Sequence, residues 1–282
     1  MIRIFSDSTC DLTKELTDRY GIEIIPLHIV LGDKEYRDRI EITPEEIYRW
    51  SDENKTTPKT SAVSIDDAMK AIQPALDEGD EIIVFCISES MSTTGNVMRM
   101  ATEELEAEDR VSVIDSANLS TGIGLLVIEA AQMAKSGLSR REIVAKIEEL
   151  KPLVRASFMV DTLTYLHRGG RCSSIAALAG GALKLHPKIE VKDGAMGAEK
   201  KYRGKYDAII LNYVKDMDEM LKNAKKDRVF ITHSGCDAEI VDKVRTHLEE
   251  LNVFDEILET RAGGVISSHC GPGTLGVLFI AN

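Results

Sequence analysis

The amino-acid sequence predicts an α/β protein built from two α/β domains. Its first half alternates short apolar runs with longer segments of helical periodicity, a pattern typical of a mostly parallel sheet with helices on both faces. Its second half also contains both kinds of segment, together with a hairpin signal, and this favours a mixed sheet with helices. The length of 282 residues agrees with two domains of ordinary size.

The N-terminal elements follow from hydrophobic patterns and helix-start signals. We expect a strand at 2–5, a helix near 13–20 and a second strand at 22–31. Thr43 is a good N-cap for the next helix, because Pro44 suits the first turn and Glu46 lies three residues after the cap. The remaining elements are a loop and helix within 58–76, a strand at 81–88, a polar loop and helix within 89–105, a strand at 110–116 and a helix within 117–137.

The C-terminal elements follow a helix expected at 139–154. We place the domain boundary near residue 155, which divides the chain into domains 1–155 and 156–282. Asp193-Gly194 lies between two strand-like arms and predicts a hairpin. The other expected elements are a strand at 156–160, a turn around Gly169-Gly170 with a helix of small residues after it, strands at 228–236 and 256–264 with a helix at 238–251 between them, and a closing strand at 274–282.

Composition and charge exclude some classes of function. Hydrophobic residues make up 43% of the chain and charged residues 29%, as in an ordinary globular protein. The formal net charge of -12 disfavours a nucleic-acid-binding protein and attraction to an anionic membrane surface. It does not exclude an anionic ligand, because donors inside a pocket outweigh a distant and screened charge.

Cysteine and histidine usage predicts neither a disulfide framework nor a metal site. The five cysteines are scattered and none has CxxC spacing, so we expect reduced thiols in a cytoplasmic protein. The six histidines are spread thinly along the chain. The N-terminus lacks the pattern of a signal peptide. The final 21 residues lack Asp, Glu, Lys and Arg, but they contain His, Ser and a Gly-Pro-Gly, which indicates a loop and a strand rather than a membrane span.

Hydroxyl groups gather where three predicted strands end, in "SDSTCD", "SESMSTTG" and "DSANLSTG". The carboxyl ends of parallel strands are where ligands of such sheets bind. Ser92 precedes a helix whose free N–H groups suit an anion, but simple N-capping also explains a serine at this place and is the favoured interpretation. Thr60 and Ser61 precede another helix and allow the same two interpretations.

Two further interpretations are open. Ser92 as a nucleophile with His269 as its base would make the protein an acyl-ester hydrolase or transferase, but no G-x-S-x-G elbow or orienting carboxylate accompanies them. A module for a phosphorylated metabolite would use "STGIG" at 120–124 with Arg168 and Arg171, whose guanidinium groups flank a glycine turn. "STGIG" resembles a phosphate loop only faintly.

Seven motifs together resemble the DegV family over essentially the whole chain. In order they are "SDSTCDL", "TSAVS", "SESMSTTG", "VIDSANLSTGIGLL", "YLHRGGR", "HSGCDAE" and "HCGPGTLGVLF". Members of this family are similar to the fatty-acid-binding subunits of bacterial fatty acid kinase, which present a bound acyl carboxylate to a separate kinase subunit. The resemblance implies two α/β domains with that carboxylate at their interface.

The resemblance also implies roles for individual residues. The family's T-S motif falls on Thr60 and Ser61, the serine of its L-S-G-T loop on Ser92, and the histidine before Gly-Pro-Gly on His269. Thr93 stands where the family has glycine and belongs to the same expected ligand-binding set. The partner-binding residues are expected to be Arg171, which matches the family's kinase-contact arginine, and its neighbour Arg168.

The resemblance therefore implies a lipid-binding protein rather than an enzyme. The expected ligand is a long-chain fatty acid such as palmitate, the expected partner is a fatty acid kinase catalytic subunit, and no cofactor or nucleic acid is expected. Hydroxyls of Thr60 and Ser92 and the imidazole of His269 satisfy a buried carboxylate, which is very costly when unpaired. The two interpretations above remain as alternatives.

Overall fold

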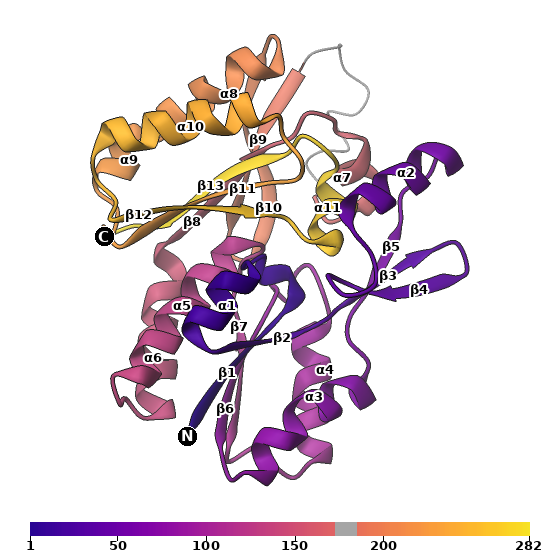
Figure 1. The fold of residues 1–282 in the computed structure, drawn as a ribbon, viewed down its shortest axis with the longest axis vertical. Coiled ribbons are helices and arrows are strands. Elements are labelled where there is room, and N and C mark those ends of the chain that lie inside the picture. Colours follow the sequence, from indigo (N-terminus) through magenta and orange to yellow (C-terminus); the bar gives the residue numbers. More distant parts are fainter. Residues whose placement is uncertain (173–184) are drawn as a thin grey trace.

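Three β-sheets and the helices around them make up the part of the protein that the structure describes. The computed structural model describes residues 1–172 and 185–282. Figure 1 shows two large layered units one above the other, with a small sheet projecting to one side. The α/β class with one parallel and one mixed sheet is confirmed.

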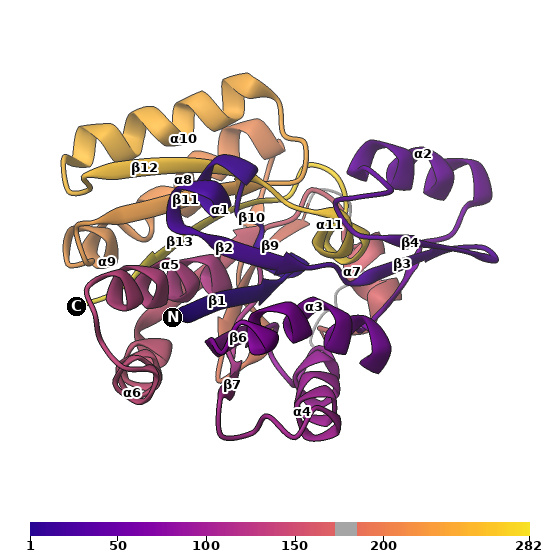
Figure 2. The ribbon, with the colours of Figure 1, turned by 60° about the horizontal axis from the view of Figure 1, so that its bottom comes forward.

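The first large sheet is wholly parallel and has the strand order β2-β1-β6-β7. Its helices cover both faces, as Figure 2 shows: α1, α5 and α6 lie on one face, and α3 and α4 on the other. The strands are β1 (Ile2–Asp7), β2 (Ile22–Ile25), β6 (Glu81–Cys86) and β7 (Val111–Asp115). The helices are α1 (Lys14–Tyr20), α3 (Ile65–Asp77), α4 (Thr94–Glu104), α5 (Thr121–Lys135) and α6 (Arg140–Leu150).

The second large sheet is mixed and has the order β10-β9-β8-β13-β11-β12, in which β11 and β12 are parallel. Its strands are β8 (Val154–Met159), β9 (Leu185–Lys192), β10 (Ala195–Arg203), β11 (Arg228–His233), β12 (Glu256–Arg261) and β13 (Leu275–Ile280). One face packs on α8 (Tyr206–Lys215), α9 (Asp218–Lys222) and α10 (Ala238–Leu251).

Helix α5 joins the two units. Residues 121–131 are all buried, because the helix packs against β1 on one side and against β8 and β13 on the other. A helix that is apolar around its whole circumference needs such a position between two layers. All strands of the parallel sheet precede residue 116 and all strands of the mixed sheet follow residue 153. The boundary near residue 155 stays a prediction.

The small sheet has the antiparallel order β4-β3-β5 and packs against helices from both ends of the chain. It consists of β3 (His28–Leu31), β4 (Lys34–Arg37) and β5 (Lys59–Ser61). Its apolar side chains meet α2 (Pro44–Asn54) and α11 (Gly264–Cys270), and α7 (Thr164–Gly169) lies beside α11.

Several elements differ from the sequence-based expectation. The strand predicted at 22–31 is two strands in two different sheets, separated at Pro26, which has no N–H for a sheet ladder. Two short strands, β4 and β5, were not expected, and neither were α8 and α9. The segment before Gly271 is the helix α11 and not a loop. The helix of small residues expected after Gly170 lies largely outside the described residues.

Candidate functional site

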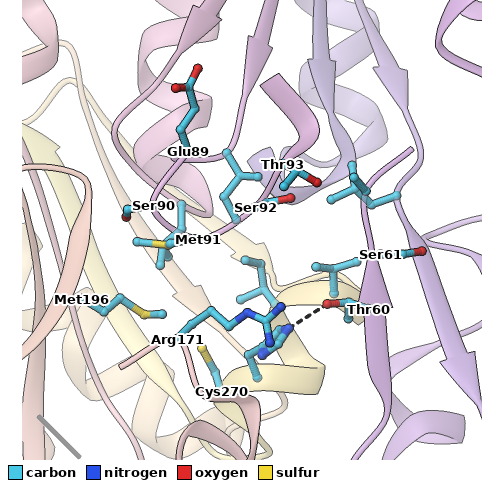
Figure 3. A pocket seen from close by; sticks show the side chains of 17 residues that line it. Thr60, Ser61, Glu89, Ser90, Met91, Ser92, Thr93, Arg171, Met196 and Cys270 are labelled. Atoms are coloured by element: carbon cyan, nitrogen blue, oxygen red, sulfur yellow. Dashed lines mark hydrogen bonds between the residues drawn. The ribbon is translucent and has the colours of Figure 1, made fainter. Parts of the chain in front are cut away.

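A cavity of about 420 Å³ lies where the small sheet, the β6–α4 loop, α11 and the β9–β10 hairpin meet. Figure 3 shows its lining from close by. Hydroxyl groups and an imidazole line it at Thr60, Ser61, Ser90, Ser92, Thr93 and His269. Apolar side chains also line it, among them Leu27, Ile87, Met91, Leu119, Met196 and Ile266, and we call them its apolar wall. The cavity thus combines polar and apolar side chains, and we call the part around Thr60 and His269 its polar end.

Thr60 and His269 meet across this cavity. Thr60 lies on β5, opposite Ile29 of β3, and His269 lies in the last turn of α11. Their Oγ1 and Nε2 atoms are 2.8 Å apart, the hydrogen bond drawn as a dashed line in Figure 3. The other ring nitrogen, Nδ1, is buried against Gly169 and has no hydrogen-bond partner among the described residues.

The His269 imidazole is neutral at pH 7. Burial, together with the positive charge of Arg171, lowers the pKa of His269 to about 4. A neutral ring has one N–H, so its tautomer decides the direction of the hydrogen bond with Thr60. With the proton on Nε2, Thr60 accepts from His269, and its own hydroxyl proton is available to a ligand.

Ser92 and Thr93 directly precede the helix α4, and Thr93 is its N-cap. The Ser92 hydroxyl lies 2.9 Å from the Thr94 hydroxyl and accepts from the Thr94 N–H. Thr93 has a φ of -88°, an ordinary value for any L-residue, so threonine in place of the family's glycine causes no backbone strain here. Its side chain is exposed and makes no capping hydrogen bond.

The two arginines of the glycine turn are separated by the structure. Arg171 lines the cavity, and its guanidinium donates to the Gly169 carbonyl at 2.6 Å. Figure 3 shows its guanidinium at the same end of the cavity as Thr60. Arg168 is exposed on α7 and is not part of the lining. Arg171 therefore adds a positive charge at the polar end, where sequence reasoning had expected only neutral donors.

The β9–β10 hairpin closes one side of the cavity. The hydroxyls of Ser88 and Ser90 both donate to the Gly194 carbonyl at the hairpin tip, with a distance of 2.6 Å from Ser88. Gly194 has a φ of +78°, and a Cβ there would lie 2.8 Å from the Ser88 hydroxyl oxygen, so this contact requires glycine. The docked tip places Met196 in the cavity wall.

Three buried carboxylates near the site were not found from the sequence. Burial raises the pKa of Asp7 to about 6 and that of Asp11 to about 7, and it also raises the pKa of Asp38. Asp7 and Asp11 belong to "SDSTCD", which drew attention for its hydroxyls, but no short-range pattern separates a buried aspartate from a turn residue. Asp38 lies in a polar segment without a recognisable motif.

The segment 120–124 is part of the packing between the two units. Thr121 shares a 2.6 Å hydrogen bond with Thr232, and the Ser120 hydroxyl donates to Asp11. A Cβ at Gly122 would lie 2.1 Å from the Asn118 side chain, so this glycine permits close packing. The residues that the structure describes contain no cluster suited to a metal ion. They also include no helix long and apolar enough to cross a membrane.

The low pKa of His269 leads to a prediction about stability. Its folded-state pKa of about 4 lies below the unfolded value, so the unfolded chain binds more protons between these two values. Between pH 7 and pH 5 the wild type should therefore lose about 2 kcal/mol more unfolding free energy than His269→Asn. Urea unfolding of both proteins at the two pH values measures this difference. Asp7 and Asp11 also titrate in this pH range, but both proteins contain them, so their contributions cancel in the comparison. Identical pH dependence of the two proteins would contradict it.

Comparison with known proteins adds family and fold relationships. The protein-family model described as "Uncharacterised protein, DegV family" matches residues 1–282 of this chain. A DegV domain-containing protein of Caldanaerobacter subterraneus subsp. tengcongensis is 32% identical over 280 residues, which cover 99% of this chain and 98% of that protein.

Solved structures share the whole fold. A DegV family protein from Thermus thermophilus, described as fatty acid binding, is 33% identical to this chain with a TM-score of 0.89. The superposition covers 100% of this chain and 99% of the Thermus chain. A stearic-acid-binding protein from Eubacterium ventriosum is 29% identical with a TM-score of 0.87. That superposition covers 100% of this chain and 98% of the Eubacterium chain. These relatives are described as binding proteins and not as enzymes. The family match over the full length and the curated relative lead to one conclusion: this chain belongs to the DegV family.

Proposed function

We propose that this protein is a cytoplasmic carrier that binds a long-chain fatty acid such as palmitate, with the carboxylate at the polar end of the cavity. The observation that carries the proposal is the cavity itself, which combines hydroxyls and an imidazole with apolar side chains in one lining. The fatty acid binding described for the Thermus relative and the stearic acid named for the Eubacterium relative support the same ligand class.

The acyl tail of such a ligand needs apolar contacts, and its carboxylate needs hydrogen-bond donors. Burying a palmitate-sized tail contributes about 10 kcal/mol before the costs of association, so the apolar wall dominates affinity. The carboxylate needs donors, because an unpaired buried charge is very costly. Thr60, Ser61, Ser92, Thr93 and His269 are the proposed ligand-binding residues. Arg171 adds a cation at the same end.

The two alternative functions have less support than fatty acid binding. A hydrolase needs His269 to activate Ser92, but His269 is hydrogen-bonded to Thr60, and Ser92 is hydrogen-bonded to Thr94. A phosphate-binding loop at 120–124 needs accessible N–H groups, but residues 120–124 are buried within the protein.

Mass spectrometry tests the proposed ligand directly. The protein should carry a long-chain fatty acid under native conditions and release it on denaturation, because the tail contributes most of the affinity. Stripped protein should take up added palmitate or oleate. Protein that is empty as purified and takes up neither acid would refute the proposal.

The finer part of the proposal concerns a partner. We infer that the bound carboxylate is presented to a separate fatty acid kinase subunit for acyl-phosphate formation, and that Arg168 and Arg171 contact this subunit. Both arginines are exposed, and Arg171 also reaches the polar end of the cavity. Arg168→Ala should leave palmitate affinity unchanged and slow acyl-phosphate formation by the cognate kinase. Unchanged acyl-phosphate formation would remove Arg168 from the partner surface.

A further inference from the structure

The helix that carries His269 begins without a capping side chain of its own. Its N-cap is Gly263, which provides no side-chain acceptor for the free N–H groups of the first turn. Two aspartates from the opposite end of the chain supply acceptors instead. Gly263 N–H donates to Asp11 Oδ1 and Gly264 N–H donates to Asp38 Oδ1, both at 2.7 Å.

The second carboxylate oxygen of each aspartate also accepts a hydrogen bond. Asp11 Oδ2 accepts from the Ser120 hydroxyl at 2.5 Å, and Asp38 Oδ2 accepts from the Ser8 hydroxyl at 2.8 Å. The Ser8 oxygen in turn accepts from the Leu27 N–H at 3.1 Å. The exposed fractions of Asp11 and Asp38 are 0% and 1%, so neither side chain has room to turn away.

The start of α11 also packs directly against the small sheet. A Cβ on Gly264 would lie 2.5 Å from Ile29 Cδ1 and 2.8 Å from Ile47 Cδ1, so the backbone of α11 touches these side chains. Ile29 of β3 is the strand partner of Thr60 on β5. The same few atoms therefore locate both the beginning of α11 and the strand that carries Thr60.

His269 follows Gly264 by five residues, or about 7.5 Å along the helix axis. A shift or tilt at the beginning of α11 therefore moves the imidazole relative to Thr60. We propose that Asp11 and Asp38 are positioning residues, which hold α11 so that His269 meets Thr60 and thereby set the preference of the cavity for a carboxylate over an ester. This inference rests on the proposed fatty-acid-binding function.

The test compares palmitate with methyl palmitate. Asp38→Ala removes the acceptor of the Gly264 N–H, so palmitate affinity should fall about tenfold while methyl palmitate affinity changes less than about twofold. Asp38→Asn keeps an oxygen at the same place and should restore most of the preference. Glu129→Ala is the matched control, because Glu129 is a buried carboxylate that contacts Arg228 and Lys225 and not α11. Its ratio of the two affinities should equal that of the wild type.

A second variant covers the case in which Asp38→Ala does not fold. Asp11 has a φ of 52°, a conformation that glycine adopts easily, so Asp11→Gly removes the carboxylate without straining the backbone. It should show the same selective loss for palmitate. In a His269→Ala background neither substitution should change the ratio further, since the group being positioned is absent.

The outcomes separate this inference from the function on which it rests. Wild-type protein that binds no palmitate refutes the proposed function. Wild-type protein that binds palmitate, with variants whose acid-to-ester ratio stays unchanged, refutes only the positioning role. If neither Asp38→Ala nor Asp11→Gly folds, the two aspartates are determinants of the fold and the positioning role is rejected.

Discussion

His269→Ala should weaken the binding of palmitate by about 10- to 150-fold, the equivalent of one lost hydrogen bond to a charged group. With the proton on Nε2, the His269 ring donates to the Thr60 oxygen at 2.8 Å and so directs the Thr60 hydroxyl proton toward the ligand. Without the ring this hydroxyl is free to turn away, and its hydrogen bond to the carboxylate is the one expected to be lost. The apolar wall is unaffected, so binding weakens and does not disappear. Methyl palmitate should be much less sensitive, because it carries no charge that needs the donor. Parallel titrations of both ligands on both proteins measure the effect.

His247→Ala serves as the control for this experiment. His247 lies on α10, hydrogen-bonds Asp218 at 2.8 Å and is not part of the cavity lining. Its replacement should leave both affinities unchanged. Equal losses of the acid and the ester in His269→Ala would show that His269 only supports the end of α11 and does not serve the carboxylate.

Glu129→Ala should lower the free energy of unfolding by about 3–5 kcal/mol, the usual result of removing one partner from a buried ion pair. Glu129 of α5 accepts from Arg228 at 2.5 Å and from Lys225 at 2.7 Å. Arg228 is only 4% exposed, so the substitution leaves a buried guanidinium without its counter-charge. Urea unfolding followed by circular dichroism measures the loss.

Two further variants test whether the unpaired charge of Arg228 causes the loss of unfolding free energy. The exposed pair between Arg19 and Glu256 also joins the two units, and Glu256→Ala should cost far less unfolding free energy than Glu129→Ala because solvent screens the pair. Replacing both buried partners, Glu129→Ala with Arg228→Met, should recover part of the loss, since no buried charge remains unpaired. A loss below about 1 kcal/mol in Glu129→Ala would show that water reaches Arg228 and compensates its charge.

Local sequence patterns determine most of the elements that surround the site. Thr43, Pro44 and Glu46 form the expected start of α2, and the Thr43 side chain and Glu46 make the reciprocal capping hydrogen bonds. Apolar runs correctly predict β1, β6 and β7 of the parallel sheet, and Asp193-Gly194 forms the expected turn between β9 and β10. These features depend on residues a few positions apart, which is the range over which side chains influence the backbone conformation of their neighbours.

The arrangement of the site depends on contacts that no short segment contains. The segment before Gly271 has no local N-cap and was expected to be a loop, but it is helical because Asp11 and Asp38 accept its first N–H groups from 252 and 226 residues away. Thr60 and His269 are 209 residues apart and meet only when the small sheet packs on α11. Motif resemblance named both residues, but their hydrogen bond, the low pKa of His269 and the buried aspartates arise from burial and proximity, which exist only in the folded chain.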